Sequence, residues 1–217
     1  MGKLQNATIG VPAARSLFTE FNKILGKKLA AVFFGSNTKL QKAIRNFRTL
    51  LQEAHRRPTL CRELITGYPH FIGIMDAAQE GTGGVAFGEM DKCIPTVFRL
   101  EWPPEVQALV CTIENPNGPI TNSDLELAGL LLCWLVLEAI APCLRHKHVA
   151  LFSDNSPSIS WVTRMATRSS KVAADLLMAL ALRMKVNEAS PLTPLHIPGK
   201  HNGIADIPSR SFGGTPK

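Results

Sequence analysis

Four acidic residues lie at positions where a carboxylate could do chemistry. Each adjoins a run of apolar sequence, and the four are Asp76, Glu126, Asp154 and Asp206. Carboxylates in apolar surroundings are poorly solvated, and they repel one another when they meet unless a cation lies between them. Hard oxygen ligands of this kind suit Mg²⁺ or Mn²⁺. If the fold brings them together, the four residues indicate a site for divalent cations.

Each acid also has a purely structural explanation. The side chain of Asp76 could start a turn, because small residues follow it. Glu126 completes a Ser-x-x-Glu pattern, which is a capping box at a helix start. Asp154 stands just before a proline suited to a first helical turn, and Asp206 could complement the positive end of a helix. Only the order of all four along the chain, and the elements that carry them, favour a shared site.

Residues 71–102 have the pattern of three short strands. FIGIMDA at 71–77 is a compact apolar run, GGVAFGE at 83–89 follows a turn-like EGTG, and VFRLEW at 97–102 alternates between apolar and charged residues. Short turns between successive strands predict an antiparallel meander. The apolar stretch 106–113 either extends the third strand or adds another, and the sequence leaves that choice open.

Helices and strands alternate in the rest of the chain. The uncharged run 127–137 predicts a core helix, because acids bracket it and it is too short to span a bilayer. The elements expected after it are a buried strand at 148–154, helices near 157–167 and 171–188, a strand at 191–197 and a short terminal helix. A meander followed by α/β alternation predicts a mixed sheet with helices on its faces.

The first 70 residues are basic and helical in pattern. They hold twelve Lys and Arg residues against three acids, a balance of +9, whereas residues 71–217 have a balance of −2. Helices are expected near 13–29 and 40–54, the second with one apolar and one basic face. Gly and Pro residues indicate a junction near residue 68. We therefore expect a basic helical region at 1–68, a second domain at 69–213 and a tail at 214–217.

Composition narrows the class of protein. A chain of 217 residues with 45% hydrophobic content is no disordered tail and can bury a core. A pI near 9.4 favours a polyanionic partner. Five cysteines without Cys-x-x-Cys spacing argue against a disulfide framework and a structural zinc site. Because the start of the chain lacks an apolar leader, we expect an intracellular protein, cytoplasmic or nuclear, with no membrane partner.

Four motifs carry the four acids: MDAAQEGTGG, TNSDLELAGLL, LFSDNSPSISWV and HIPGKHNGIADIPSR, which together span about residues 70–213. Together they resemble the ribonuclease H domain of retroelement reverse transcriptases. The last is the most diagnostic, because these residues fit the retrotransposon form: Pro198, Gly199, Asn202, Ala205, Asp206, Ser209 and Arg210. The resemblance implies a ribonuclease H-like α/β fold with a five-stranded mixed sheet and flanking helices. It also likens the basic N-terminal region to the thumb or connection region that precedes this domain.

The resemblance implies a metal-dependent endonuclease that hydrolyses the RNA strand of RNA–DNA hybrids. Two Mg²⁺ or Mn²⁺ ions would be held by acids matching Asp76, Glu126, Asp154 and Asp206, with Asp76 bridging them. One ion would activate a water for in-line attack, and the other would stabilise the leaving 3′ oxygen. The chain has no Tyr-x-Asp-Asp polymerase motif. The polymerase part of the same polyprotein is therefore a candidate partner.

Residues beyond the four acids are candidates for proton transfer and substrate contact. Family members carry a His on a loop before the last Asp, and of His196 and His201 we select His201, although a solvated loop position explains it equally well. Backbone groups could contact the 2′-OH of RNA, and basic side chains could contact phosphates. The substrate candidates are Gly83, Gly84, Asn155, Arg164, Arg168, Lys200 and Asn202.

Two other functions compete with hybrid cleavage. One is a catalytically silent ribonuclease H-like domain kept as a nucleic-acid-binding scaffold, and the other is a DNA-cutting nuclease on the same fold. Loss of one acid would favour the scaffold, but all four are present. The HIPGKHNGIAD ending speaks against a transposase or resolvase. Hybrid cleavage is therefore the leading hypothesis.

Overall fold

The computed structural model describes most of the chain from residue 39 onward. The described residues are 18, 39–59, 61, 65, 67–89, 95–167, 169–190, 192–210 and 212. Apart from Phe18, the helix expected near 13–29 lies outside the described residues. So do Arg168, one of the substrate candidates, and the expected tail at 214–217.

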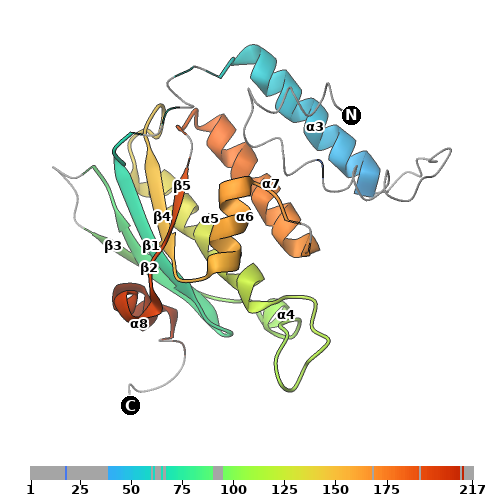
Figure 1. Cartoon of the computed structure of the whole chain (residues 1–217), viewed down its shortest axis with the longest axis vertical. Helices are drawn as coiled ribbons and strands as arrows, with labels where there is room; N and C mark the ends of the chain where they lie inside the picture. The colour runs from blue at the N-terminus through green and yellow to red at the C-terminus, as the bar shows by residue number, and fades with distance from the viewer. Residues whose placement is uncertain are drawn as a thin grey trace.

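A five-stranded mixed sheet forms the centre of the fold (Figure 1). Its strands are β1 (Phe71–Ala77), β2 (Gly81–Phe87), β3 (Thr96–Glu101), β4 (Val149–Ser153) and β5 (Thr193–His196). They lie in the order β3-β2-β1-β4-β5. β2 is antiparallel to both of its neighbours, whereas β4 is parallel to both of its neighbours. The expected meander and the mixed sheet are therefore confirmed.

Helices cover both faces of this sheet. Those described after the meander are α4 (Pro104–Gln107), α5 (Asn122–Ile140), α6 (Ser156–Arg164), α7 (Lys171–Val186) and α8 (Gly203–Ser209), with a 3₁₀ turn η3 (Gly199–His201). A Cβ added at Gly83 would meet α8, whereas Thr82 lies against Gly129 of α5. Because consecutive strand residues point to opposite faces, α8 and α5 lie on opposite faces of the sheet. No helix among the described residues is long and apolar enough to cross a membrane.

The stretch 106–113 neither extends the third strand nor adds another. Two prolines follow Trp102, and because proline has no N–H to donate to a strand ladder, β3 ends and α4 begins. Beyond α4, buried Val110 forms an isolated parallel bridge with Ile120. Within this stretch Val110 is the buried residue that anchors the connection to α5, whereas Leu109 and Ile113 are exposed.

The described helix of the N-terminal region, α3 (Lys39–Arg56), packs along α7. Phe47 and Leu50 are buried against Met178 and Leu182 of α7. The ring of Phe18 meets that of Phe47 edge-on, with centroids 5.5 Å apart. This confirms the second expected helix, and its apolar face is the one that contacts α7.

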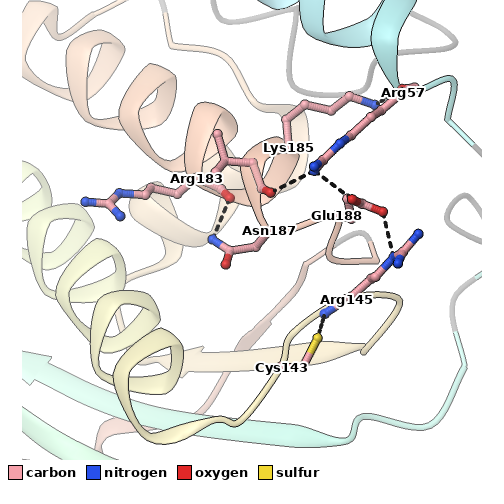
Figure 2. Close-up of polar contacts among 8 residues, drawn as sticks. Arg57, Cys143, Arg145, Arg183, Lys185, Asn187 and Glu188 are labelled. Carbon is pink, nitrogen blue, oxygen red and sulfur yellow. Dashed lines mark hydrogen bonds and ion pairs between the residues drawn. The ribbon is translucent and has the colours of Figure 1, made fainter.

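Polar contacts join α3 to α7 at their carboxyl ends (Figure 2). Arg57 Nη1 lies 2.6 Å from Glu188 Oε1 and also donates to the Val186 carbonyl. Lys185 Nζ donates to the Arg57 carbonyl at 2.8 Å, and Arg145 Nε lies 2.8 Å from the other Glu188 oxygen. Cations complement the carbonyls at a helix C-terminus, so each helix end is stabilised by a side chain from the other. We call Arg57, Arg145, Lys185 and Glu188 the α3–α7 clasp.

Candidate metal centre

Three of the four acids meet at the carboxyl ends of β1 and β4. Asp76 lies one residue before the end of β1, Asp154 directly follows β4, and Glu126 lies in the first turns of α5. Each offers a carboxylate oxygen, and these oxygens lie within 4.8 Å of one another. β1 and β4 are adjacent and parallel, so their carboxyl ends lie side by side. We call Asp76, Glu126 and Asp154 the acidic cluster.

Hydrogen-bond donors hold two of the carboxylates in place. Ser209 Oγ donates to Asp76 Oδ2 at 2.6 Å. Ser153 Oγ donates to Glu126 Oε2 at 3.0 Å, and the backbone N–H of Ala77 also donates to Glu126. Asp76 is only 5% exposed and Glu126 only 2%. Both carboxylates are therefore fixed and shielded from water, with uncharged donors as partners.

Burial makes charge costly in the acidic cluster. It raises the pKa of Glu126 from 4.5 to about 8, and the neighbouring carboxylate of Asp76, then that of Asp154, adds to the rise. Burial also raises the pKa of Asp76, and the charges of Asp154 and Asp206 act in the same direction. Near neutral pH the cluster therefore keeps a proton when no cation is bound.

Asp206 lies beside the cluster. It occupies the first turn of α8, and its Oδ1 lies 2.6 Å from Arg210 Nε. Its charge nevertheless adds to the rise in the pKa of Asp76. The compact group thus consists of three acids, and Asp206 is ion-paired at its edge.

The structural explanation of Glu126 as a capping residue is wrong. The N-cap of α5 is Thr121, and the residue that completes its capping box is Asp124. Glu126 therefore takes no part in the cap and lies in the cluster instead. At the start of α6 the cap is Asn155, so that Asp154 is not needed there either.

The candidate substrate contacts lie in several places around the cluster. Asn155 follows Asp154 directly, whereas Arg164 is exposed at the far end of α6. η3 passes close to Asp154, because a Cβ added at Gly199 would lie 2.9 Å from Asp154 Oδ2. The remaining two residues of η3, both exposed, are Lys200 and His201. Both follow Gly199 directly, so the turn that carries them passes beside Asp154.

Close packing explains the glycines of β2. A Cβ at Gly83 would lie 2.5 Å from the carbonyl carbon of Pro208, and one at Gly84 would lie 2.3 Å from the Ile74 carbonyl oxygen. Both glycines are buried. Contacts inside the protein therefore explain why both positions are glycine. No contact with a substrate is needed to explain them.

The structure corrects the role expected for Asn202. Its side chain is 1% exposed, and its Nδ2 donates to the Met75 carbonyl at 3.2 Å. Asn202 therefore connects the start of α8 to β1 and is shielded from a substrate. Sequence reasoning also missed the serines of the cluster, Ser153 and Ser209. Ser153 adjoins Asp154 and Ser209 lies in the closing motif, but serine is too common a residue to signal such a role.

Comparisons with known proteins give structural likenesses alone. No family model and no curated protein matches the chain. Similar solved structures include ribonuclease H1 from Halobacterium salinarum, at 13% identity and a TM-score of 0.42, covering 65% of this chain and 94% of that one. LC11-RNase H1 from compost has 15% identity and a TM-score of 0.42, covering 64% and 92%. The N-terminal RNase H domain of a Mycobacterium tuberculosis protein has 12% identity and a TM-score of 0.41, covering 64% and 88%.

The strand order and the flanking helices of this chain are those of a ribonuclease H-like fold. The fold that the sequence motifs implied is therefore confirmed.

The donor set of the acidic cluster fits a hard divalent cation. Among the described residues, the group that could hold a metal ion consists of carboxylates alone, with no His or Cys. Oxygen ligands select Mg²⁺ or Mn²⁺ over softer metals. Opposite ligands of one Mg²⁺ lie about 4.2 Å apart. The cluster therefore has the size at which carboxylates share or flank such ions.

Proposed function

We propose that this chain is a metal-dependent endonuclease that hydrolyses the RNA strand of RNA–DNA hybrids as part of a retroelement reverse transcriptase. The observation that carries the proposal is the convergence of Asp76, Glu126 and Asp154, with ligand oxygens within 4.8 Å of one another. The HIPGKHNGIADIPSR motif supports the retroelement context. The polymerase part of the same polyprotein is the proposed partner, and the site of action is intracellular.

The acidic cluster would hold two Mg²⁺ or Mn²⁺ ions. Bound ions supply an activated water for attack on the scissile phosphate and stabilise the leaving 3′ oxygen. Asp76 is the best candidate to contact both ions, because its carboxylate interacts electrostatically with Glu126, Asp154 and Asp206. The serine and backbone donors keep the carboxylates oriented before substrate arrives.

Asp206 remains the proposed fourth ligand. Its ion pair with Arg210 joins two side chains that are 46% and 68% exposed, and such pairs exchange at little energetic cost. Its carboxylate can therefore turn from Arg210 to a cation. His201, exposed on η3, remains the candidate for proton transfer or product release.

Basic residues would bind the hybrid through its phosphates. Arg45 and Arg48 are exposed on α3, whose apolar face is buried against α7. Lys200 lies on η3, next to Gly199 and thus near Asp154 along the chain trace, and Arg164 lies at the end of α6. Contacts of this kind are independent of sequence, whereas the region of Asn155 would contact the 2′-OH that distinguishes RNA from DNA.

A cleavage assay tests this proposal against the alternatives. The purified chain is incubated with Mg²⁺ and a labelled RNA–DNA hybrid, beside single-stranded RNA and duplex DNA. We expect cleavage of the RNA strand in the hybrid alone, and its loss in Asp154→Asn. The matched control is Asp175→Asn, which removes an exposed carboxylate on α7 that pairs with Lys42.

The other outcomes favour other functions. Hybrid binding without cleavage by the unaltered chain would support the nucleic-acid-binding scaffold. Cleavage of duplex DNA would support a DNA-cutting nuclease. Hybrid cleavage that survives in Asp154→Asn would exclude the acidic cluster as the active site.

A further inference from the structure

The last helix is bound to β1 at both of its ends. At its start, Asn202 Nδ2 donates to the Met75 carbonyl at 3.2 Å. At its end, Ser209 Oγ donates to Asp76 Oδ2 at 2.6 Å. Asn202 is 1% exposed and Ser209 is 0% exposed, so water cannot replace either bond. α8 is therefore held in one position over the acid at the end of β1.

The strand next to Asp76 leaves room for this contact. Gly83 of β2 is the cross-strand neighbour of Asp76. A Cβ at this position would lie 2.5 Å from the carbonyl carbon of Pro208 and 2.6 Å from the Ser209 nitrogen. Both are backbone atoms that cannot rotate aside. The missing side chain of Gly83 therefore lets α8 approach closely enough for Ser209 to reach Asp76.

The Ser209 hydroxyl uses only one of the two oxygens of Asp76. A donor on one carboxylate oxygen fixes the rotation of the group and leaves the other oxygen to bind a cation. Partners of this kind orient metal ligands and are worth a large share of the affinity of the site. Ser153 does the same for Glu126 from the strand that leads into Asp154, but Ser209 comes from 133 residues further along the chain than Asp76.

We propose that Ser209 is a positioning residue of the metal centre, and that α8 serves to hold it there. Its hydroxyl fixes Asp76 Oδ2 so that the second oxygen is presented to the cations. The proposal rests on the proposed function, because it concerns the same ions. It assigns a role to the serine of the closing motif, which otherwise has none in hybrid cleavage.

Calorimetric titration of the full chain with Mn²⁺ tests this role without relying on activity. We expect Ser209→Ala to weaken Mn²⁺ binding roughly tenfold. Ser209→Thr keeps the hydroxyl and should retain most of the affinity, whereas Gly83→Ala should weaken binding by displacing α8. In the cleavage assay, Ser209→Ala should lower kcat while the KM for hybrid stays unchanged. The matched control is Ser190→Ala, a serine 6% exposed beside the amino end of β4.

The outcomes separate this proposal from the proposed function. If the unaltered chain binds no Mn²⁺, the proposed function itself fails. If the unaltered chain binds Mn²⁺ and folded Ser209→Ala binds it equally well, Ser209 has no positioning role. Circular dichroism shows whether Ser209→Ala is folded. Should it be unfolded, Ser209→Cys keeps the volume with a weaker donor, and unchanged Mn²⁺ affinity in that variant overturns the proposal.

Discussion

Acidic side chains are shielded at both ends of the sheet, but in opposite electrostatic settings. At the carboxyl ends of β1 and β4, the acidic cluster gathers charges of one sign, and the donors to Asp76 and Glu126 are hydroxyl and N–H groups. Beside the amino end of β4, the carboxylate of Glu188 lies between Arg57 and Arg145, at 2.6 and 2.8 Å. The carboxylates of the cluster repel one another, whereas the single carboxylate of Glu188 is paired with two arginines of the protein.

This difference in charge distinguishes the acidic cluster, a candidate binding site, from the α3–α7 clasp, a structural contact. The carboxylate of the clasp has cationic partners within the protein, so it needs no cation from outside, and the clasp holds α3 against α7 (Figure 2). The cluster can lose its repulsion only by taking up protons or cations. Since burial and repulsion both oppose its charge, the cluster costs stability until a cation binds. Substitutions in the acidic cluster should therefore lower activity without lowering stability. Substitutions in the clasp should lower stability without lowering activity.

Asp76→Asn should have the largest effect. Losing the acid that interacts with the other three removes ~4 kcal/mol of transition-state stabilisation, which corresponds to about a thousandfold slower hybrid cleavage. Stability should not fall, because the change also removes repulsion. Cleavage rates with Mg²⁺ and thermal unfolding in EDTA measure the two effects. If Asp76→Asn were still active and less stable than the unaltered chain, the proposed difference between the acidic cluster and the clasp would be contradicted.

The metal-free protein should lose stability as the pH rises from about 4.5 to 8. The pKa of Glu126 is raised from 4.5 to about 8, so in this window the folded state keeps a proton that the unfolded state releases. The stabilisation from this group is fully present below pH 4.5 and is gone above pH 8, a change on the order of a few kcal/mol. Thermal unfolding in EDTA across this range measures it.

Glu126→Gln is the control for this pH dependence. Because this variant has no carboxyl group at position 126, its stability should fall much less as the pH rises from about 4.5 to 8. In the unaltered chain, Mn²⁺ should bind more tightly as the pH rises through the same window, because cation and proton compete for the cluster. Mn²⁺ affinity that is independent of pH would count against this interpretation.

Glu188→Gln should lower stability and leave hybrid cleavage unchanged, the reverse of what is expected for Asp76→Asn, and the effect should be smaller. It leaves Arg57 and Arg145 without their carboxylate, and because both arginines are more than half exposed the free energy of unfolding should fall by only about 1 kcal/mol. Hybrid cleavage should be unchanged. Urea denaturation at low and high salt checks this, since salt should shrink the difference. A cleavage defect as large as that of Asp76→Asn would remove the distinction between the two regions.

Arg45→Gln combined with Arg48→Gln should have the smallest effect. Hybrid affinity should fall severalfold, and the slope of log affinity against log salt should become shallower by about two. Fluorescence anisotropy with labelled hybrid measures both. Thr49→Ala, an exposed neighbour without charge, is the control. An unchanged slope would mean that α3 does not contact the phosphates.

The strands and the acids at their ends could be predicted because the sequence pattern is local. FIGIMDA coincides with β1 (Phe71–Ala77), and the run before Asp154 coincides with β4 (Val149–Ser153). Adjacent parallel strands end at the same edge, so acids at two such ends must lie near each other. The position of this part of the candidate site therefore follows from the strand boundaries together with the parallel pairing of β1 and β4, which the resemblance implied and the structure shows.

Other parts of the site depend on packing that the sequence does not show. Two overlapping patterns, Thr121-x-x-Asp124 and Ser123-x-x-Glu126, both fit a capping box, and the structure selects the first. The contact between Ser209 and Asp76 joins residues 133 apart, through a gap left by Gly83. No periodicity encodes such a contact, since it depends on how closely a helix approaches the sheet.

Anomalous scattering from crystals soaked in Mn²⁺ would decide whether the acidic cluster is a metal centre. We predict manganese among Asp76, Glu126 and Asp154, and none at this position in crystals of Asp154→Asn. Crystals of the unaltered chain without manganese here at saturating concentration, with the three carboxylates turned away from one another, would contradict the proposed chemistry.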